Sequence, residues 1–84
     1  SQFQGCPDLS NYAFTGELSL SGKVLPVGGI PEKLFGAYMN GVSEVFLPAA
    51  NYYDLRTVSS KIKEDLLFHF VTDYKEAIEV LWNQ

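Results

Sequence analysis

Cysteine, histidine and long apolar segments are scarce in this 84-residue sequence. Cys6 is the only cysteine, so the chain cannot form an internal disulfide, and no histidine stands at metal-ligand spacing from it. The longest apolar run, residues 66–71, has the length of a strand and is far too short to cross a bilayer as a helix. The N-terminus lacks the basic start and apolar core of a secretory signal. We therefore expect no disulfide scaffold, metal site, membrane span or secretion.

Basic residues are also few, with six Lys and Arg against ten Asp and Glu and a net charge of −4. No basic stripe is present, so nucleic acid is not an expected partner. Hydrophobic residues, in contrast, make up 46% of the chain and include six Phe and five Tyr. So small a core cannot bury all of this surface, and we expect part of it to contact another segment or subunit.

Hydrophobic periodicity and turn residues predict a mixed α/β fold with the element order β-β-α-β-α-β-α. The two later strands should be parallel neighbours, because a helix separates them. Residues 1–11 are expected to be the end of a helix and an irregular connection, and the polar residues 57–65 a solvated surface. Strands are expected at residues 13–21, 23–27, 42–47 and 66–71, and helices at residues 31–39, 52–55 and 74 to about 82.

Capping signals set the expected helix boundaries. Pro31 is favoured in a first turn, and Asn40-Gly41 can end the same helix in a left-handed conformation. Asn51 is expected to cap the short helix at residues 52–55. Asp73, with Glu76 three residues later, predicts a capping box at the start of the last helix.

Lys33 stands where an ammonium group is hard to keep. Gly28-Gly29 end the preceding strand and Pro31 places Lys33 within the first turn of a helix, whose positive dipole end disfavours a cation. Desolvation would act in the same direction, and a neutral amine in such a place is a candidate general base. A lysine at a helix start is, however, more often a solvated surface charge. The apolar neighbours expected to desolvate it are Val27, Ile30 and Leu34.

Three motifs surround this lysine at defined spacing. They are Thr-Gly-Glu at residues 15–17, Gly-Gly-x-x-x-Lys ending at Lys33, and Phe-Leu-Pro-x-x-Asn ending at Asn51. The glycine pair and lysine alone would be a weak signal, but the combination over residues 13–51 resembles the C-terminal half of the proteolytic domain of Lon, the ATP-dependent protease. The resemblance covers nearly the whole chain, fades over residues 52–65 and returns in the last strand and helix.

The resemblance implies a fold like domain 2 of ribosomal protein S5 and places Lys33 on the lysine of a Ser-Lys catalytic dyad. It also implies that the hydroxyl of Thr15 accepts a hydrogen bond from this amine and orients it. The nucleophilic serine of the family would lie upstream of Ser1. Residues 1–84 are therefore expected to be the C-terminal portion of the domain and to be inactive alone. None of the chain's own serines lies in a Gly-x-Ser-x-Gly elbow, and we interpret them as structural.

The same resemblance implies several properties of a parent protein. ATP and magnesium would bind a separate upstream domain, because Gly28-Gly29 lack the spacing of a phosphate-binding loop. Expected partners are a protein or peptide substrate, the upstream half of the domain, and further copies in a homo-oligomeric ring. The compartment would be the bacterial cytoplasm or the mitochondrial matrix. The absence of basic residues over residues 36–40 departs from the family and leaves open a diverged, non-catalytic interaction module.

His69 lies between Phe68 and Phe70 on an expected strand and should therefore face away from them, toward solvent or a polar rim. No acid partner and nucleophile stand at a spacing that would suit catalysis. The sequence favours a structural role for this histidine.

Overall fold

The computed structural model describes residues 11–83. The expectations for Cys6, Ser10 and the start of the chain lie outside these residues. The described elements are β1 (Tyr12–Phe14), β2 (Glu17–Leu18), β3 (Val24–Leu25), α1 (Ile30–Met39), β4 (Glu44–Pro48), the 3-10 helix η1 (Ala49–Thr57), α2 (Ser60–Asp65), β5 (Leu67–Val71) and α3 (Tyr74–Trp82).

The larger sheet has three parallel strands in the order β1-β4-β5. Its register places Phe46 of β4 between Phe14 of β1 and His69 of β5. The expected parallel pairing of the two later strands is therefore confirmed. The mixed α/β class is confirmed as well, with one more strand and one more helical segment than the sequence predicted.

The single strand expected over residues 13–21 is wrong, because the structure divides it into two strands of different sheets. β1 pairs with β4, whereas β2 pairs antiparallel with β3 in a hairpin. Gly16 lies between them, and a Cβ atom at this position would be 3.0 Å from Val24 Cγ1 and 3.1 Å from Pro48 Cγ. Glycine therefore permits a close approach of the two sheets that the alternating pattern alone could not predict.

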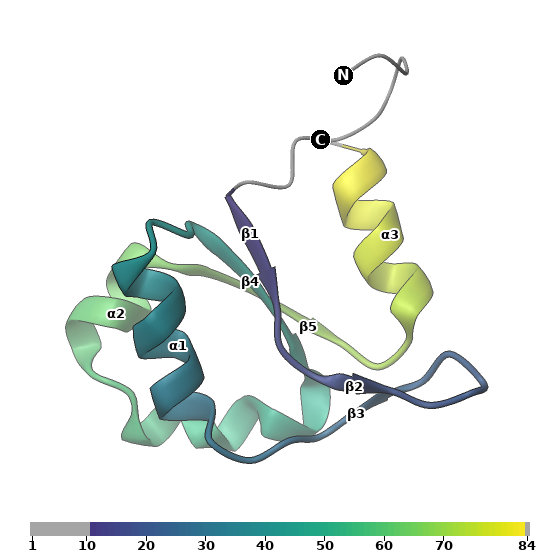
Figure 1. The fold of residues 1–84 in the computed structure, drawn as a ribbon, viewed down its shortest axis with the longest axis horizontal. Coiled ribbons are helices and arrows are strands. Elements are labelled where there is room, and N and C mark those ends of the chain that lie inside the picture. Colours follow the sequence, from purple (N-terminus) through teal and green to yellow (C-terminus); the bar gives the residue numbers. More distant parts are fainter. Residues whose placement is uncertain (1–10, 84) are drawn as a thin grey trace.

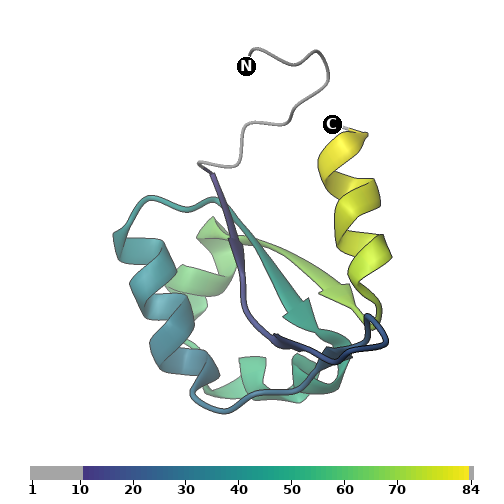
Figure 2. The ribbon, with the colours of Figure 1, turned by 45° about the vertical axis from the view of Figure 1, so that its right-hand side comes forward.

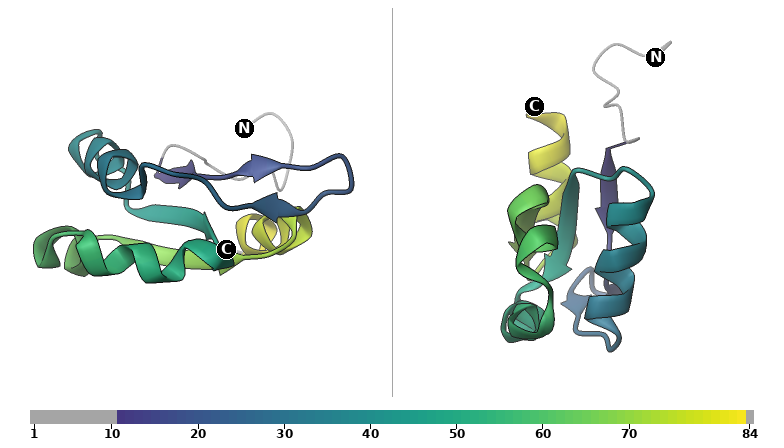
Figure 3. Two further views of the ribbon diagram at one scale, coloured as in Figure 1. Left: turned by 90° about the horizontal axis from the view of Figure 1, so that it is seen from below. Right: turned by 90° about the vertical axis from the view of Figure 1, so that its left-hand side faces the viewer.

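Helices cover the two faces of the larger sheet unequally. Figure 1 shows α1 and α2 on one side of the strands and α3 on the other, and the edge-on view of Figure 3 agrees. The Cα extents are 39 × 30 × 16 Å, so the described chain is thin. The main core lies between the sheet and α1, η1 and α2, and its buried members are Ile30, Leu34, Val45, Leu47, Val58, Ile62 and Leu66.

Between β4 and β5, one expectation is wrong and another is incomplete. Asn51 does not cap a helix at residues 52–55; it lies inside η1, which begins directly after Pro48. Residues 57–65 are not simply a solvated connection, since they contain α2, whose N-cap Ser59 accepts a hydrogen bond from the Ile62 backbone N–H at 3.3 Å. Val58 and Ile62 are buried while their polar neighbours are exposed, so two apolar anchors hold this short segment on the core.

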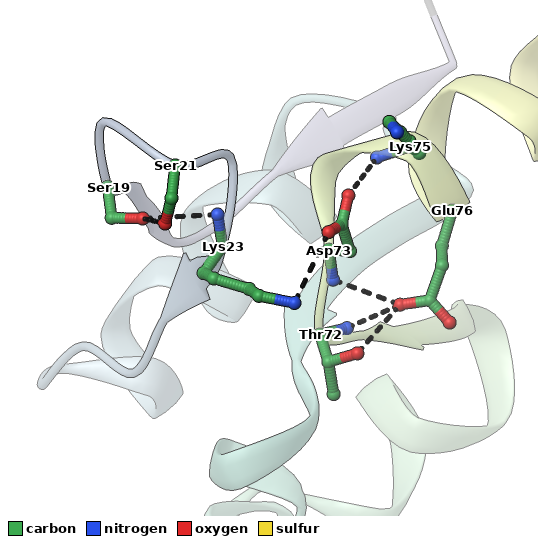
Figure 4. Close-up of polar contacts among 7 residues, drawn as sticks. All are labelled: Ser19, Ser21, Lys23, Thr72, Asp73, Lys75 and Glu76. Carbon is green, nitrogen blue, oxygen red and sulfur yellow. Dashed lines mark hydrogen bonds and ion pairs between the residues drawn. The ribbon is translucent and has the colours of Figure 1, made fainter.

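The predicted capping box at the start of α3 is confirmed. Asp73 accepts a hydrogen bond from the Lys75 backbone N–H, and the Glu76 carboxylate accepts from the backbone N–H groups of Thr72 and Asp73 (Figure 4). Lys23 Nζ of the hairpin lies 3.5 Å from Asp73 Oδ2 in an ion pair. The backbones of the same two residues form an antiparallel β-bridge. These contacts attach the hairpin to the start of α3, and Figure 2 shows the two segments next to each other.

Candidate active site

A pocket of about 560 Å³ lies between the β1–β2 connection and α1. It contains both predicted site residues, Thr15 and Lys33, which come from distant segments of the chain. Among residues 11–83, no serine or cysteine lines it. Its lining residues are Phe14, Thr15, Gly16, Glu17, Val27, Gly28, Glu32, Lys33, Gly36 and Ala37.

Thr15 is held at the end of β1 by the larger sheet. Its backbone N–H donates a hydrogen bond to the Phe46 carbonyl at 2.9 Å, which continues the β1–β4 pairing by one residue. The side chain is half-buried. No hydrogen bond joins its hydroxyl to the Lys33 amine within the described residues, so the structure places the two groups in one pocket without the expected bond between them.

Lys33 is placed by the start of α1. Gly29 is the N-cap residue in the left-handed region, with φ 71°, and provides no side-chain cap. The Lys33 backbone N–H donates to the Gly29 carbonyl at 3.0 Å, so Lys33 lies in the first turn as predicted. Its amine is therefore near the positive end of the helix dipole.

The apolar neighbours of Lys33 do not desolvate it as expected. Ile30 and Leu34 are 1% and 0% exposed and belong to the main core, on the side of α1 that faces the sheet. Lys33 itself is exposed in this chain. Burial of the amine would therefore require a cover from outside residues 11–83.

Two carboxylates, Glu17 and Glu32, share the pocket with Lys33. Both are exposed. Glu32 lies in the first turn of α1, where a negative charge complements the helix dipole. The pocket thus carries charges of both signs, with negative charge in excess by one.

Asn51 was missed as a site-supporting residue, because the sequence suggested a capping role. It is 4% exposed, and its side-chain amide bonds to both backbone groups of Val27, which lines the pocket. The Phe-Leu-Pro-x-x-Asn motif was the available signal. A helix cap and the pair of bonds to Val27 both use the asparagine side-chain amide, so the residue type alone could not distinguish these two roles.

The described serines have structural contacts, in agreement with their interpretation. Ser19 and Ser21 hydrogen-bond to each other in the hairpin turn at 2.9 Å, Ser43 donates to the Asn11 carbonyl, and Ser59 caps α2. Ser60 is the first residue of α2. None of the described serines reaches the pocket.

His69 has an acid partner that the sequence did not reveal. Its Nε2 lies 2.8 Å from Glu44 Oε1, and its ring stacks on Phe46 with the centroids 4.8 Å apart. It points to the face opposite Phe68 and Phe70, as predicted, and there it is half-buried against Phe46 and Glu44. It does not line the pocket of Lys33.

Residues 11–83 contain no group of three or more His, Cys, Asp or Glu side chains that could hold a metal ion. Across the same residues, every helix is too short or too polar to span a membrane.

Known proteins match this chain over most of its length. The family model described as the Lon protease (S16) C-terminal proteolytic domain matches residues 1–84. Lon protease 1 of Bdellovibrio bacteriovorus is 48% identical over 68 residues, covering 81% of the chain and 9% of that protein. Lon protease 1 of Thermus thermophilus is 41% identical over 81 residues, covering 96% of the chain and 10% of that protein. The mitochondrial Lon protease homolog of Rattus norvegicus is 47% identical over 76 residues, covering 90% of the chain and 8% of that protein. The chain thus spans a tenth or less of these curated relatives.

Proposed function

Because this chain belongs to the family of Lon protease C-terminal proteolytic domains, we propose that it is the part of an ATP-dependent serine endopeptidase that supplies the general base, Lys33. The observation that supports this role best is the pocket itself. Two distant segments bring the Thr15 hydroxyl and the Lys33 amine to one cavity beside the backbone of Gly16 and Gly28.

In the proposed reaction, neutral Lys33 accepts the proton of a serine hydroxyl that comes from outside residues 11–83. The serine oxygen attacks a peptide carbonyl, and the C–N bond breaks to give an acyl-enzyme. The Lys33 ammonium returns the proton to the leaving amine. Thr15 orients the lysine by accepting one of its N–H groups, which fixes the direction of the amine without adding charge.

Lys33 lies in the first turn of α1 and shares its exposed pocket with the carboxylates of Glu17 and Glu32. In the parent protein, the segment that carries the serine would cover this pocket and exclude water from the reacting groups.

The remaining properties of the parent protein are proposals drawn from the family. The described residues offer no phosphate-binding loop and no metal-ligand cluster, so ATP and magnesium would act in a separate domain. The substrates would be unfolded or regulatory proteins, and the working form a homo-oligomeric ring. Both bacterial and mitochondrial relatives are named, and we propose the corresponding compartment for this chain according to its source.

The test is made in the full-length protein that carries this chain. Lys33→Ala and Lys33→Arg should each lower kcat for cleavage of an unstructured protein by about 10²-fold or more, because arginine keeps the charge but cannot accept a proton. Lys63→Arg, at an exposed lysine of α2 outside the pocket, is the matched control and should retain activity. Wild-type cleavage by Lys33→Ala would refute the general-base role.

Two further variants and the isolated chain complete the test. Thr15→Val removes the hydroxyl and should lower kcat, whereas Thr15→Ser keeps it and should retain most activity. The 84-residue chain alone should show no peptidase activity, since a base without its nucleophile supplies no covalent step. Time-dependent cleavage by the isolated chain, abolished by Lys33→Ala, would contradict this expectation.

A further inference from the structure

The Asn51 side chain pairs with Val27 as a neighbouring strand would. The Val27 backbone N–H donates to Asn51 Oδ1 at 3.0 Å, and Asn51 Nδ2 donates to the Val27 carbonyl at 2.9 Å. Val27 itself lies beyond the end of β3 and belongs to no strand. A single buried side chain therefore satisfies both backbone groups of a residue that has no sheet partner.

Asp54 fixes the direction of this amide. Its carboxylate accepts a hydrogen bond from Asn51 Nδ2. An ionised carboxylate can only accept, so the NH₂ end of the amide must face Asp54 and the oxygen is left for the Val27 N–H. Both residues lie on η1, one turn apart, and η1 also packs against α1. The Asn51–Val27 bonds and the helix that carries Lys33 are therefore both held by η1.

The two Asn51–Val27 hydrogen bonds act on residues 27–29, whose backbone has few other constraints. Gly28 and Gly29 follow Val27 directly and have the largest backbone freedom of any residues. Gly29, the N-cap of α1, has no side chain with which to fix the start of the helix. Val27 and Gly28 line the pocket, and the Gly29 carbonyl accepts the Lys33 backbone N–H. The bonds from Asn51 thus hold the chain two residues before the N-cap of α1, next to the helix that carries Lys33.

We propose that Asn51, oriented by Asp54, is a positioning residue for the Lys33 amine. It holds the backbone of Val27 so that the diglycine connection starts α1 with Lys33 facing Thr15. This role rests on the general-base function of Lys33. Neither Asn51 nor Asp54 lines the pocket, so both act through Val27 rather than on substrate.

The test compares Asn51→Ala and Asp54→Ala in the full-length protein, with kcat expressed per folded molecule. Displacing a catalytic group by about 1 Å can lower a rate by about 10²-fold, so Asn51→Ala should lower kcat by about tenfold to a hundredfold with KM nearly unchanged. Asp54→Ala removes one acceptor of the Asn51 amide but keeps both bonds to Val27, and it should give a smaller loss. Amide exchange at the Val27 N–H should accelerate in both variants.

The matched control is Ile62→Val, which weakens the same core but removes neither hydrogen bond between Asn51 and Val27. It should lower stability and leave kcat per folded molecule unchanged. The proposal is overturned if kcat per folded molecule stays within about twofold of wild type in Asn51→Ala, or in Asp54→Ala should Asn51→Ala not fold. Lys33→Ala separates the positioning role of Asn51 from the general-base role of Lys33. If Lys33→Ala is inactive while Asn51→Ala and Asp54→Ala are fully active, only the positioning role fails. If Lys33→Ala is active, the general-base role fails.

Discussion

Gly16 and Val24 pack closely where the chain passes from β1 to β2. A Cβ atom on Gly16 would lie 3.0 Å from Val24 Cγ1, which is tighter than nine in ten real Cβ contacts. Val24 is buried and Pro48 stands on the other side, so neither neighbour can move freely. The wall of the pocket beside Thr15 therefore depends on a glycine.

Gly16→Ala should lower the free energy of unfolding by about 1–3 kcal/mol, the usual penalty for overpacking a closely packed site. Chemical denaturation of the 84-residue chain measures it. Gly36→Ala is the control, since a Cβ atom there would meet nothing within 4 Å and alanine favours the helix by about 1 kcal/mol. Equal effects of the two substitutions would show that the contact at Gly16 is not tight.

The capping box of α3 should make stability depend on acid pH. Backbone N–H donors, from Lys75 to Asp73 and from Thr72 and Asp73 to Glu76, hold the pKa of each carboxyl below its ordinary value of 3.8 or 4.5. The unfolded chain then binds these protons more readily, so the stabilisation is complete above the ordinary pKa values and is lost as pH falls through the folded ones. The free energy of unfolding should therefore decline below about pH 4.5.

Glu76→Gln should flatten this decline, because glutamine can still accept the capping hydrogen bonds but does not titrate in this range. Glu79→Gln, on the same helix, is the control: the Glu79 carboxylate accepts no hydrogen bond from residues 11–83 and should leave the decline unchanged. Unfolding curves between about pH 3 and pH 6 compare the three proteins. An identical slope in all of them would refute the assignment of the decline to this cap.

Ile62→Ala should lower the free energy of unfolding by about 2–5 kcal/mol, because it leaves a cavity in the main core. Lys61→Ala, one residue away, removes an exposed ion pair with Asp65 and should change the free energy by about 0.5 kcal/mol or less. Thermal or urea unfolding distinguishes them. A small effect at Ile62 would mean that α2 does not anchor residues 57–65.

Phe14 and Leu67 point to the sheet face that α3 only partly covers, and they are 41% and 57% exposed. We expect the 84-residue chain to self-associate or to bind the rest of its domain through this face, with Tyr12 beside them. Phe14→Ser should weaken association in sedimentation experiments, whereas Leu20→Ser, at the exposed hairpin turn, should not. A strictly monomeric chain that binds no hydrophobic dye would contradict this prediction.

Local signals in the sequence predicted the elements whose causes are local. The Pro31 and Gly41 boundaries of α1, the apolar strands β4 and β5, and the Asp73 capping box all depend on residues within a few positions of one another. The family resemblance likewise predicted one site for Thr15 and Lys33, and the structure brings both to one pocket without the expected hydrogen bond.

The errors arose where distant contacts decide the structure. The corner at Gly16 depends on Val24 and Pro48, and the role of Asn51 depends on the unpaired backbone of Val27. Residues 57–65 contain few apolar positions, so no periodicity could reveal that Val58 and Ile62 reach the core. The Glu44–His69 pair likewise exists only because of the β4–β5 register.

The hydrogen bond from the Thr15 N–H to the Phe46 carbonyl has a consequence for how the pocket forms during folding. Thr15 reaches its place only after β1 has paired in parallel with β4, a step that must close a long loop and is slow for that reason. Lys33 lies on α1, whose buried residues Ile30 and Leu34 pack on the same sheet. We therefore expect the Thr15 wall of the pocket to form only when β1 joins β4, so that a long-range pairing completes the site.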